Sequence, residues 1–147
     1  MEDIMEYVVF EIENECYGLD IKFVENIEKA QAITRVPFAK DYIKGVINLR
    51  GNIIPVMDLR RRFLLEKKEI TKDTRIIIIN FNNYNIGLIV DFSSEVVQLK
   101  KSDIEVAPKI GNAINNNFIR EVGKDQERII MLLDIKKVLG ILETENK

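Results

Sequence analysis

Histidine and tryptophan are absent from this 147-residue chain, and cysteine occurs once, at Cys16. Without histidine there is no histidine-based general base, catalytic triad or metal site. A single thiol forms neither an internal disulfide nor a cysteine-rich zinc site, and its apolar neighbours predict a buried side chain. The seven glycines form neither a phosphate-binding loop nor a dinucleotide fingerprint. The sequence therefore predicts that the protein is not an enzyme and has no metal and no cofactor.

Strong net charge and long apolar runs are missing as well. The net charge is −2 and the pI is about 5.4, so no strong field for nucleic acid or an acidic membrane is expected. The longest aliphatic run, 76–79, is far too short to span a membrane, and the acidic start lacks the features of a signal peptide. We expect a cytoplasmic protein of one compact domain, or of two small halves that share a core.

Many short strand patterns separated by turns make up most of the chain, which favours a barrel or a sandwich over an α/β fold. The segment 21–36 is ambiguous between helix and strand, residues 41–45 predict one helical turn that Gly45 ends, and 107–117 is the longest predicted loop. The predicted strands are 7–12, 16–19, 46–49, 53–57, 75–81, 84–90, 95–99, 118–122 and 128–133.

The strands 46–49 and 53–57 predict a hairpin. Gly51 and Asn52 would form its two-residue loop, because glycine in the first position suits a type II′ turn. Pro55 cannot donate a hydrogen bond to a neighbouring strand, so the returning strand is expected at a sheet edge or a bulge.

Residues 53–63 and residues 129–139 have similar sequence patterns, which suggests an internal repeat. In both segments an apolar strand precedes an aspartate, Asp58 or Asp134, that would cap a short basic helix. The second helix is predicted over 135–142. This repeat predicts two similar β units.

Two arginine features have open interpretations. The run 60–62 is either a solvated helix face or, less plausibly, a phosphate contact, since it lacks aromatic stacking partners. Arg50 is either a paired surface arginine or an anchor in a protein interface, where arginine is enriched. Its position alone leaves both open.

Residues 45–60 have the pattern G-V-I-N-L-R-G-x-I-I-P-V-x-D-L-R, which resembles the CheW-like domain family of bacterial chemotaxis coupling proteins. The resemblance extends over nearly the whole chain. It continues at 7–12, 17–21, 33–37, 86–91 and 129–139.

The resemblance implies a mainly β fold of two small five-stranded SH3-like β-barrels on a shared apolar core, with short helices including a C-terminal one. Residues 1–147 would form one domain of two intertwined subdomains. The implied function is that of a non-enzymatic adaptor, cytoplasmic and recruited to membrane receptor arrays. It would couple chemoreceptors to the histidine kinase CheA by binding the receptor's cytoplasmic tip and the kinase's regulatory domain.

The implied sites form two groups. Without the resemblance, the aliphatic members of the first group would be interpreted as plain core packing. The receptor-binding residues would be Val24, Ile27, Gly45, Arg50, Gly51 and Val96, and the kinase-binding residues Ile53, Ile54, Glu105 and Ile110.

Three alternatives remain from the sequence alone. The first is an adaptor for a CheA-like kinase outside chemotaxis. The second is the coupling domain of a receiver-fused protein, against which the end at Lys147 weighs. The third is a small β-barrel that binds RNA or carbohydrate.

Overall fold

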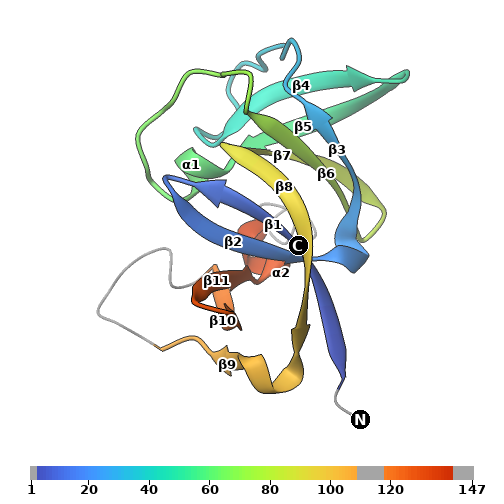
Figure 1. Cartoon of the computed structure of the whole chain (residues 1–147). Coiled ribbons are helices and arrows are strands. Elements are labelled where there is room, and N and C mark those ends of the chain that lie inside the picture. Colours follow the sequence, from blue (N-terminus) through green and yellow to red (C-terminus); the bar gives the residue numbers. More distant parts are fainter. Residues whose placement is uncertain (1–2, 109–117, 141–147) are drawn as a thin grey trace.

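The computed structural model describes residues 3–108 and 118–140, and these form two β-sheets (Figure 1). Sheet A has the strand order β8-β1-β2-β11-β10-β9, and sheet B has the order β3-β6-β7-β5-β4. The elements in chain order are β1 (Ile4–Ile12), β2 (Glu15–Asp20), η1 (Ile21–Phe23), β3 (Val24–Lys29), β4 (Ile43–Leu49), β5 (Asn52–Asp58), α1 (Leu59–Arg62), β6 (Arg75–Phe81), β7 (Tyr84–Val90), β8 (Phe92–Lys100), η2 (Lys101–Asp103), β9 (Ile104–Val106), β10 (Ile119–Asp125), β11 (Arg128–Leu133) and α2 (Ile135–Val138).

The two sheets follow the same plan. The order β3-β6-β7-β5-β4 in sheet B corresponds to β8-β1-β2-β11-β10 in sheet A, with a parallel pair, β7–β5 or β2–β11, in each centre. Asp58 and Asp134 cap α1 and α2 at equivalent places, accepting hydrogen bonds from the backbone N–H groups of Arg60 and Lys137. The internal repeat predicted from the sequence is therefore confirmed.

Each sheet also takes one edge strand from the chain segment next to a strand of the other sheet. β3 follows directly after β2 of sheet A but pairs with β6 of sheet B, and β8 follows β7 of sheet B but pairs with β1 of sheet A. The sheets are thus intertwined, and the mainly β class is confirmed. Among the described residues, the strand pairings leave both sheets open, so the closed barrels remain a prediction.

The core consists of three apolar clusters, and one of them joins the two sheets. The first lies between the sheets and contains Val8 and Phe10 from β1 together with Ile77 and Leu88 from sheet B. The other two lie on the opposite faces of sheet A and sheet B. Successive residues along β1 and β6 are buried because each strand is covered on both faces. The cluster between the sheets is called the shared core below.

Arg60 connects elements of both sheets, and its residue is only 8% exposed. Its guanidinium donates Nε and Nη2 to the Asp91 carboxylate at 2.8 Å each, and Nη1 lies 2.6 Å from Glu13 Oε2. Asp91 also accepts a hydrogen bond from the Glu13 backbone N–H at 2.9 Å. One buried cation therefore ties α1 to the β7–β8 junction and to the β1–β2 turn.

The other two arginines of α1 are also engaged inside the molecule. Arg61 pairs with Asp41 and donates to the Leu65 carbonyl at 2.9 Å. Arg62 lies over the rings of Tyr42 and Phe118 and donates to backbone carbonyls of α2. The interpretation of 60–62 as a solvated helix face is wrong, because all three guanidinium groups have partners within the fold.

Three local predictions are wrong for reasons of backbone geometry. The two-residue loop consists of Arg50 and Gly51, both with positive φ (51° and 89°), so it is of type I′ rather than a type II′ turn at Gly51-Asn52. Residues 41–45 form no helical turn, since β4 already begins at Ile43. The connection between the predicted strands 118–122 and 128–133 is shorter than those bounds imply, because β10 continues to Asp125.

Pro55 and the remaining segments need smaller corrections. β5 lies inside sheet B, but it pairs with β7 only from Val56 onward, so Pro55 stands where only β4 is paired. The ambiguous segment 21–36 contains η1 and β3, and β9 was not predicted. The predicted helix 135–142 is described as α2 up to Val138, and its last part lies outside the described residues.

We predict that Asp91→Ala destabilises the fold by about 3 kcal/mol, because it leaves the buried Arg60 guanidinium without its bidentate partner. The double variant Arg60→Met/Asp91→Leu should recover at least half of that loss, since it removes both charges together. Urea unfolding followed by circular dichroism measures both. A double variant that is less stable than Asp91→Ala would contradict this account.

The same carboxyl predicts an acid-sensitive part of the stability. Burial alone would raise the pKa of Asp91, but the hydrogen bonds from Arg60 and the Glu13 N–H outweigh it and lower the pKa. The unfolded-state pKa is about 3.9, so this contribution is complete well above pH 4 and is lost as the pH falls through the lower folded pKa. Between pH 5 and pH 3, Asp91→Asn should lose less unfolding free energy than the wild type. The exposed Asp73→Asn should behave like the wild type.

Candidate protein-interaction site

A bulge in β3 sets the direction of its two predicted receptor-binding residues. The pairing register shifts between Val24 and Asn26, so Val24 pairs with Ile79 and Ile27 pairs with Ile77. Ile77 and Ile79 both belong to the shared core. Val24 and Ile27 therefore lie on one face of this edge strand, at the margin of the shared core, and Ile27 is 40% exposed.

Val96 has the equivalent position in sheet A. It lies on the edge strand β8 and pairs with Val8, a residue of the shared core, as Ile27 pairs with Ile77. Val96 is 49% exposed. The two exchanged strands, β3 and β8, thus each present one exposed aliphatic side chain at the margin of the shared core. Ile27 and Val96 are therefore too exposed to be ordinary core residues.

Arg50 stands at the tip of the β4–β5 hairpin and reaches back to β3. Its Nη2 lies 3.4 Å from Glu28 Oε2, and its side chain remains 68% exposed. A surface pair of this kind is worth at most about 1 kcal/mol, so a partner's carboxylate can replace Glu28 at small cost. Its backbone has φ of 51°, a conformation that non-glycine residues seldom adopt. Arg50, Val24, Ile27 and Val96 are called the edge surface below.

The two predicted glycines have different roles. Gly51 is exposed in the hairpin loop, and a Cβ placed there would meet nothing within 4 Å. Gly45 is buried, has φ of 154°, and would place a Cβ only 2.1 Å from the Thr34 carbonyl oxygen. That oxygen accepts the Val46 N–H at 2.8 Å. Gly45 therefore presents no exposed surface of its own, and it lets the chain at Thr34 approach β4; its part in a receptor-binding site stays a prediction.

The predicted kinase-binding residues are not brought together. Ile53 is 65% exposed on sheet B, whereas Ile54 is only 3% exposed and belongs to the apolar cluster of that sheet, although it also contributes to the lining of the groove described next. Successive residues of β5 face opposite ways, which explains the contrast. Glu105 is exposed on β9 of sheet A, where it pairs with Lys124 at 3.2 Å. Ile110 lies outside the described residues.

Ile53 instead lines a groove of about 720 Å³ where the first half of β5 separates from the β6–β7 turn. Tyr84 is 49% exposed on the opposite side, and Phe38, fully exposed, stands at the rim. Their exposure comes from the tertiary structure, and no pattern in the sequence marked either aromatic residue. This space is called the β5 groove. Its lining includes Phe38, Ala39, Lys40, Ile43, Asn52, Ile53, Pro55, Met57, Tyr84 and Ile86.

The described residues hold no group of three or more histidine, cysteine, aspartate and glutamate side chains placed to bind a metal ion. No helix within residues 3–108 and 118–140 has the length and apolarity that crossing a membrane requires. Cys16 is half-buried rather than fully buried, and burial raises the pKa of its thiol, which favours the neutral form.

Two mixed sheets with an exposed apolar edge and an apolar groove form a protein suited to binding other proteins. A sequence model described as the CheW-like domain matches residues 6–143. The chain is 40% identical to the chemotaxis protein CheW of Bacillus subtilis, over 90% of this chain and 85% of that protein. It is 36% identical to the chemotaxis protein CheW of Klebsiella aerogenes, over 92% and 81% of the two chains.

A solved structure agrees with these matches. The scaffolding protein TtCheW from Thermoanaerobacter tengcongensis superposes with a TM-score of 0.82 at 38% identity, covering 91% of this chain and 90% of that one. The chain belongs to the CheW-like domain family.

We predict that Gly45→Ala destabilises the protein by more than 2 kcal/mol, because the new methyl group collides with the Thr34 carbonyl and breaks its bridge to Val46. Gly51→Ala meets no atom and should cost only about 1 kcal/mol, from its positive φ. Thermal unfolding of both variants measures the difference. Equal losses for the two variants would show that the backbone near Thr34 moves aside.

Proposed function

We propose that this protein is a non-enzymatic chemotaxis adaptor that holds chemoreceptors and a CheA-type histidine kinase together. The match to the CheW-like domain over nearly the whole chain carries the proposal. The relatives named above support it, since they are chemotaxis proteins and a scaffolding protein. The protein acts in the cytoplasm as one domain, residues 1–147, whose two subdomains are SH3-like barrels, and it is recruited to receptor arrays.

The edge surface is the receptor-binding site. A receptor tip is a helical hairpin, and a helix that lies along a groove needs apolar anchors on one face and a few polar contacts. Ile27 and Val96 supply exposed aliphatic anchors from the two sheets. Arg50 is held next to β3 by the type I′ loop and its contact with Glu28, and it exchanges Glu28 for a receptor carboxylate.

The β5 groove is the kinase-binding site. Ile53, Tyr84 and Phe38 offer apolar anchors of the size found at interface hot spots. The first half of β5 has no β7 partner, so its free side allows close packing of a second β-structured domain. Glu105, on the other sheet, would make a second, weaker contact with a kinase domain of similar fold.

The mechanism is a bridge of fixed geometry. The β3 part of the edge surface and the β5 groove are both carried by sheet B, in which β3 pairs with β6, β6 with β7, and β7 with the second half of β5. Val96 adds to the edge surface from β8 of sheet A. A displacement of the receptor tip at β3 therefore reaches the kinase domain through a continuous hydrogen-bonded sheet. A coupling free energy of about 1–3 kcal/mol is enough to shift the kinase strongly between active and inactive states.

The receptor site is tested by Arg50→Glu. The variant should bind a receptor signalling-tip fragment at least about tenfold more weakly, since it places a repelling charge where the anchor stood. Binding to the kinase regulatory domain should be unchanged. The matched control is Arg120→Glu, at an exposed arginine of sheet A. Wild-type receptor binding by Arg50→Glu in a calorimetric titration would remove Arg50 from the site.

The kinase site is tested by Ile53→Asp, which should abolish detectable binding to the regulatory domain of a CheA-type kinase while receptor binding persists. Ile129 is the equivalent residue of the repeat and is 54% exposed on β11, so Ile129→Asp is a closely matched control and should bind normally. Surface plasmon resonance with both baits measures the result. Equal losses for the two variants would contradict an assignment to the β5 groove.

A further inference from the structure

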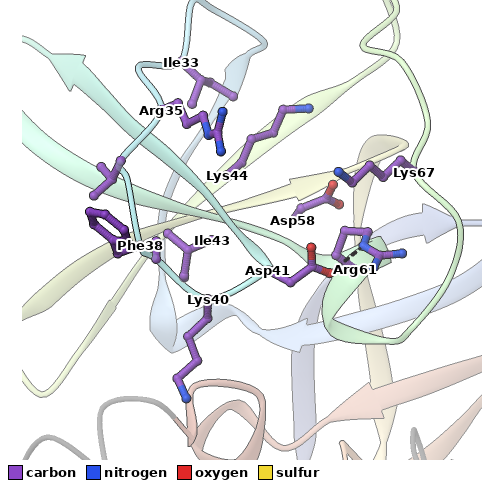
Figure 2. Close-up of a pocket in the computed structure, with 12 residues that line it drawn as sticks. Ile33, Arg35, Phe38, Lys40, Asp41, Ile43, Lys44, Asp58, Arg61 and Lys67 are labelled. Atoms are coloured by element: carbon purple, nitrogen blue, oxygen red, sulfur yellow. Dashed lines mark hydrogen bonds and ion pairs between the residues drawn. The ribbon is translucent and has the colours of Figure 1, made fainter.

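A second pocket, of about 550 Å³, lies beside the β5 groove and differs from it in charge (Figure 2). Its lining includes five basic side chains and two acidic ones. Figure 2 shows Arg35, Lys44 and Lys67 around the pocket and Lys40 pointing away from it. It is called the basic pocket below.

Three of these cations have no ion pair among the residues that the structure describes. Arg35, Lys44 and Lys67 are all exposed, and neither hydrogen bonds nor salt bridges engage their charged groups. The cations of α1 behave differently, since each of them has a partner in the fold. Most surface lysines point freely into water, but three cations without a salt bridge, from separate segments around one pocket, form a local positive field, even though the charge of Lys44 also acts on the Asp58 carboxylate.

The acidic residues of the pocket do not cancel this field. Asp41 is paired with Arg61, which the dashed line in Figure 2 marks. Asp58 is 8% exposed and its carboxylate is engaged by the Arg60 N–H at 3.0 Å as the cap of α1. Burial raises the pKa of Asp58, while the backbone hydrogen bonds from Arg60 and Arg61 and the nearby charge of Lys44 act in the opposite direction. The pocket therefore keeps an excess of positive charge, although the whole chain is slightly acidic.

The basic pocket and the β5 groove adjoin each other. Phe38, Ala39, Lys40 and Ile43 line both of them. Phe38 stands at the shared rim with its side chain fully exposed and its backbone at φ of 64°. A left-handed backbone is a genuine outlier for a bulky residue, and such outliers concentrate at functional sites. One ligand can therefore pass over Phe38 and occupy both spaces.

We propose that the basic pocket receives carboxylate side chains of a protein partner whose apolar residues occupy the β5 groove. The docking segment of that partner carries leucine-like anchors followed within a few residues by two or more acidic residues. The inference rests on the proposed use of the β5 groove for a protein partner and adds the charge that this partner must have. Arg35 binds a carboxylate through its two-pronged guanidinium, and Lys44 and Lys67 act as point charges.

The test uses a synthetic hexapeptide with two leucines, a glycine and three glutamates, and its counterpart in which glutamines replace the glutamates. Both are titrated into the full chain, labelled with ¹⁵N, and backbone amide shifts are recorded. The acidic peptide should shift the amides of residues 33–44 and 67, and the glutamine peptide should bind about tenfold more weakly. Raising the salt concentration should weaken only the acidic peptide.

Matched variants locate the effect. Arg35→Glu/Lys44→Glu should weaken the acidic peptide at least tenfold and leave the glutamine peptide unchanged. Lys29→Glu/Lys72→Glu makes the same change of charge at exposed lysines outside both pockets and should bind like the wild type. Both variants replace exposed side chains, and dispersed amide spectra verify that they are folded. Equal binding of the two peptides, or equal losses in the two variants, would overturn the inference.

The kinase regulatory domain separates this inference from the proposed function. If the acidic peptide binds as expected but the kinase domain does not bind the wild-type chain, the partner assignment is wrong and the basic pocket stands. If the kinase domain binds the wild type and Arg35→Glu/Lys44→Glu equally, the proposed function stands and the basic pocket is not part of its interface.

Discussion

The structure depends on one constraint, which is that each sheet has two apolar faces to bury. The runs Tyr7–Phe10 and Ile76–Ile79 are buried at every position, so both sides of β1 and β6 need cover. Each sheet covers one face with its own small cluster and the other with the second sheet. Neither half can satisfy this alone, and the exchange of β3 and β8 follows the same logic. β3 and β8 are edge strands, so the shared core stops beside them and leaves Ile27 and Val96 partly exposed as the edge surface.

Electrostatics then fix how the halves meet. A hydrophobic interface alone is tolerant of sliding, because burial of apolar area has little directional preference. The bidentate pair of Arg60 with Asp91, joined by Glu13, is directional and links α1 to the β1–β2 turn. Arg62 adds a second link, from α1 to the carbonyls at the end of α2. The arginine run thus holds the two halves in one relative position, which the bridge proposed above would require.

The sequence predicted most strands and the repeat, and its errors share a physical origin. The strands 75–81, 84–90 and 128–133 agree with the structure because apolar runs between turn residues leave little choice. The errors at 41–45 and at the β4–β5 loop arose where positive φ values at Gly45 and Arg50 decide the path. Periodicity carries no information on such angles. The start of β4 and the position of the β4–β5 loop could therefore not be predicted from the sequence pattern.

The candidate sites divide in the same way. The family pattern pointed to Ile27, Arg50, Ile53 and Val96, and the structure leaves all four exposed. It could not separate Ile53 from Ile54, because the direction of a side chain depends on the register of its strand. Phe38 was missed since its importance comes from the two pockets that meet beside it. Exposure of an aromatic residue is a property of the whole fold and leaves no local trace.

The repeat also lets one backbone plan carry two different surfaces. Equivalent positions of the two sheets share a backbone but not their side chains. The loop of the β4–β5 hairpin is Arg50-Gly51, whereas the β10–β11 loop is Gln126-Glu127, with Gln126 also at positive φ. The same hairpin thus presents a cation on one sheet and an acid on the other. Because the shared core keeps the backbones fixed, a side-chain change at a hairpin tip alters the local charge without moving the sheet that carries it.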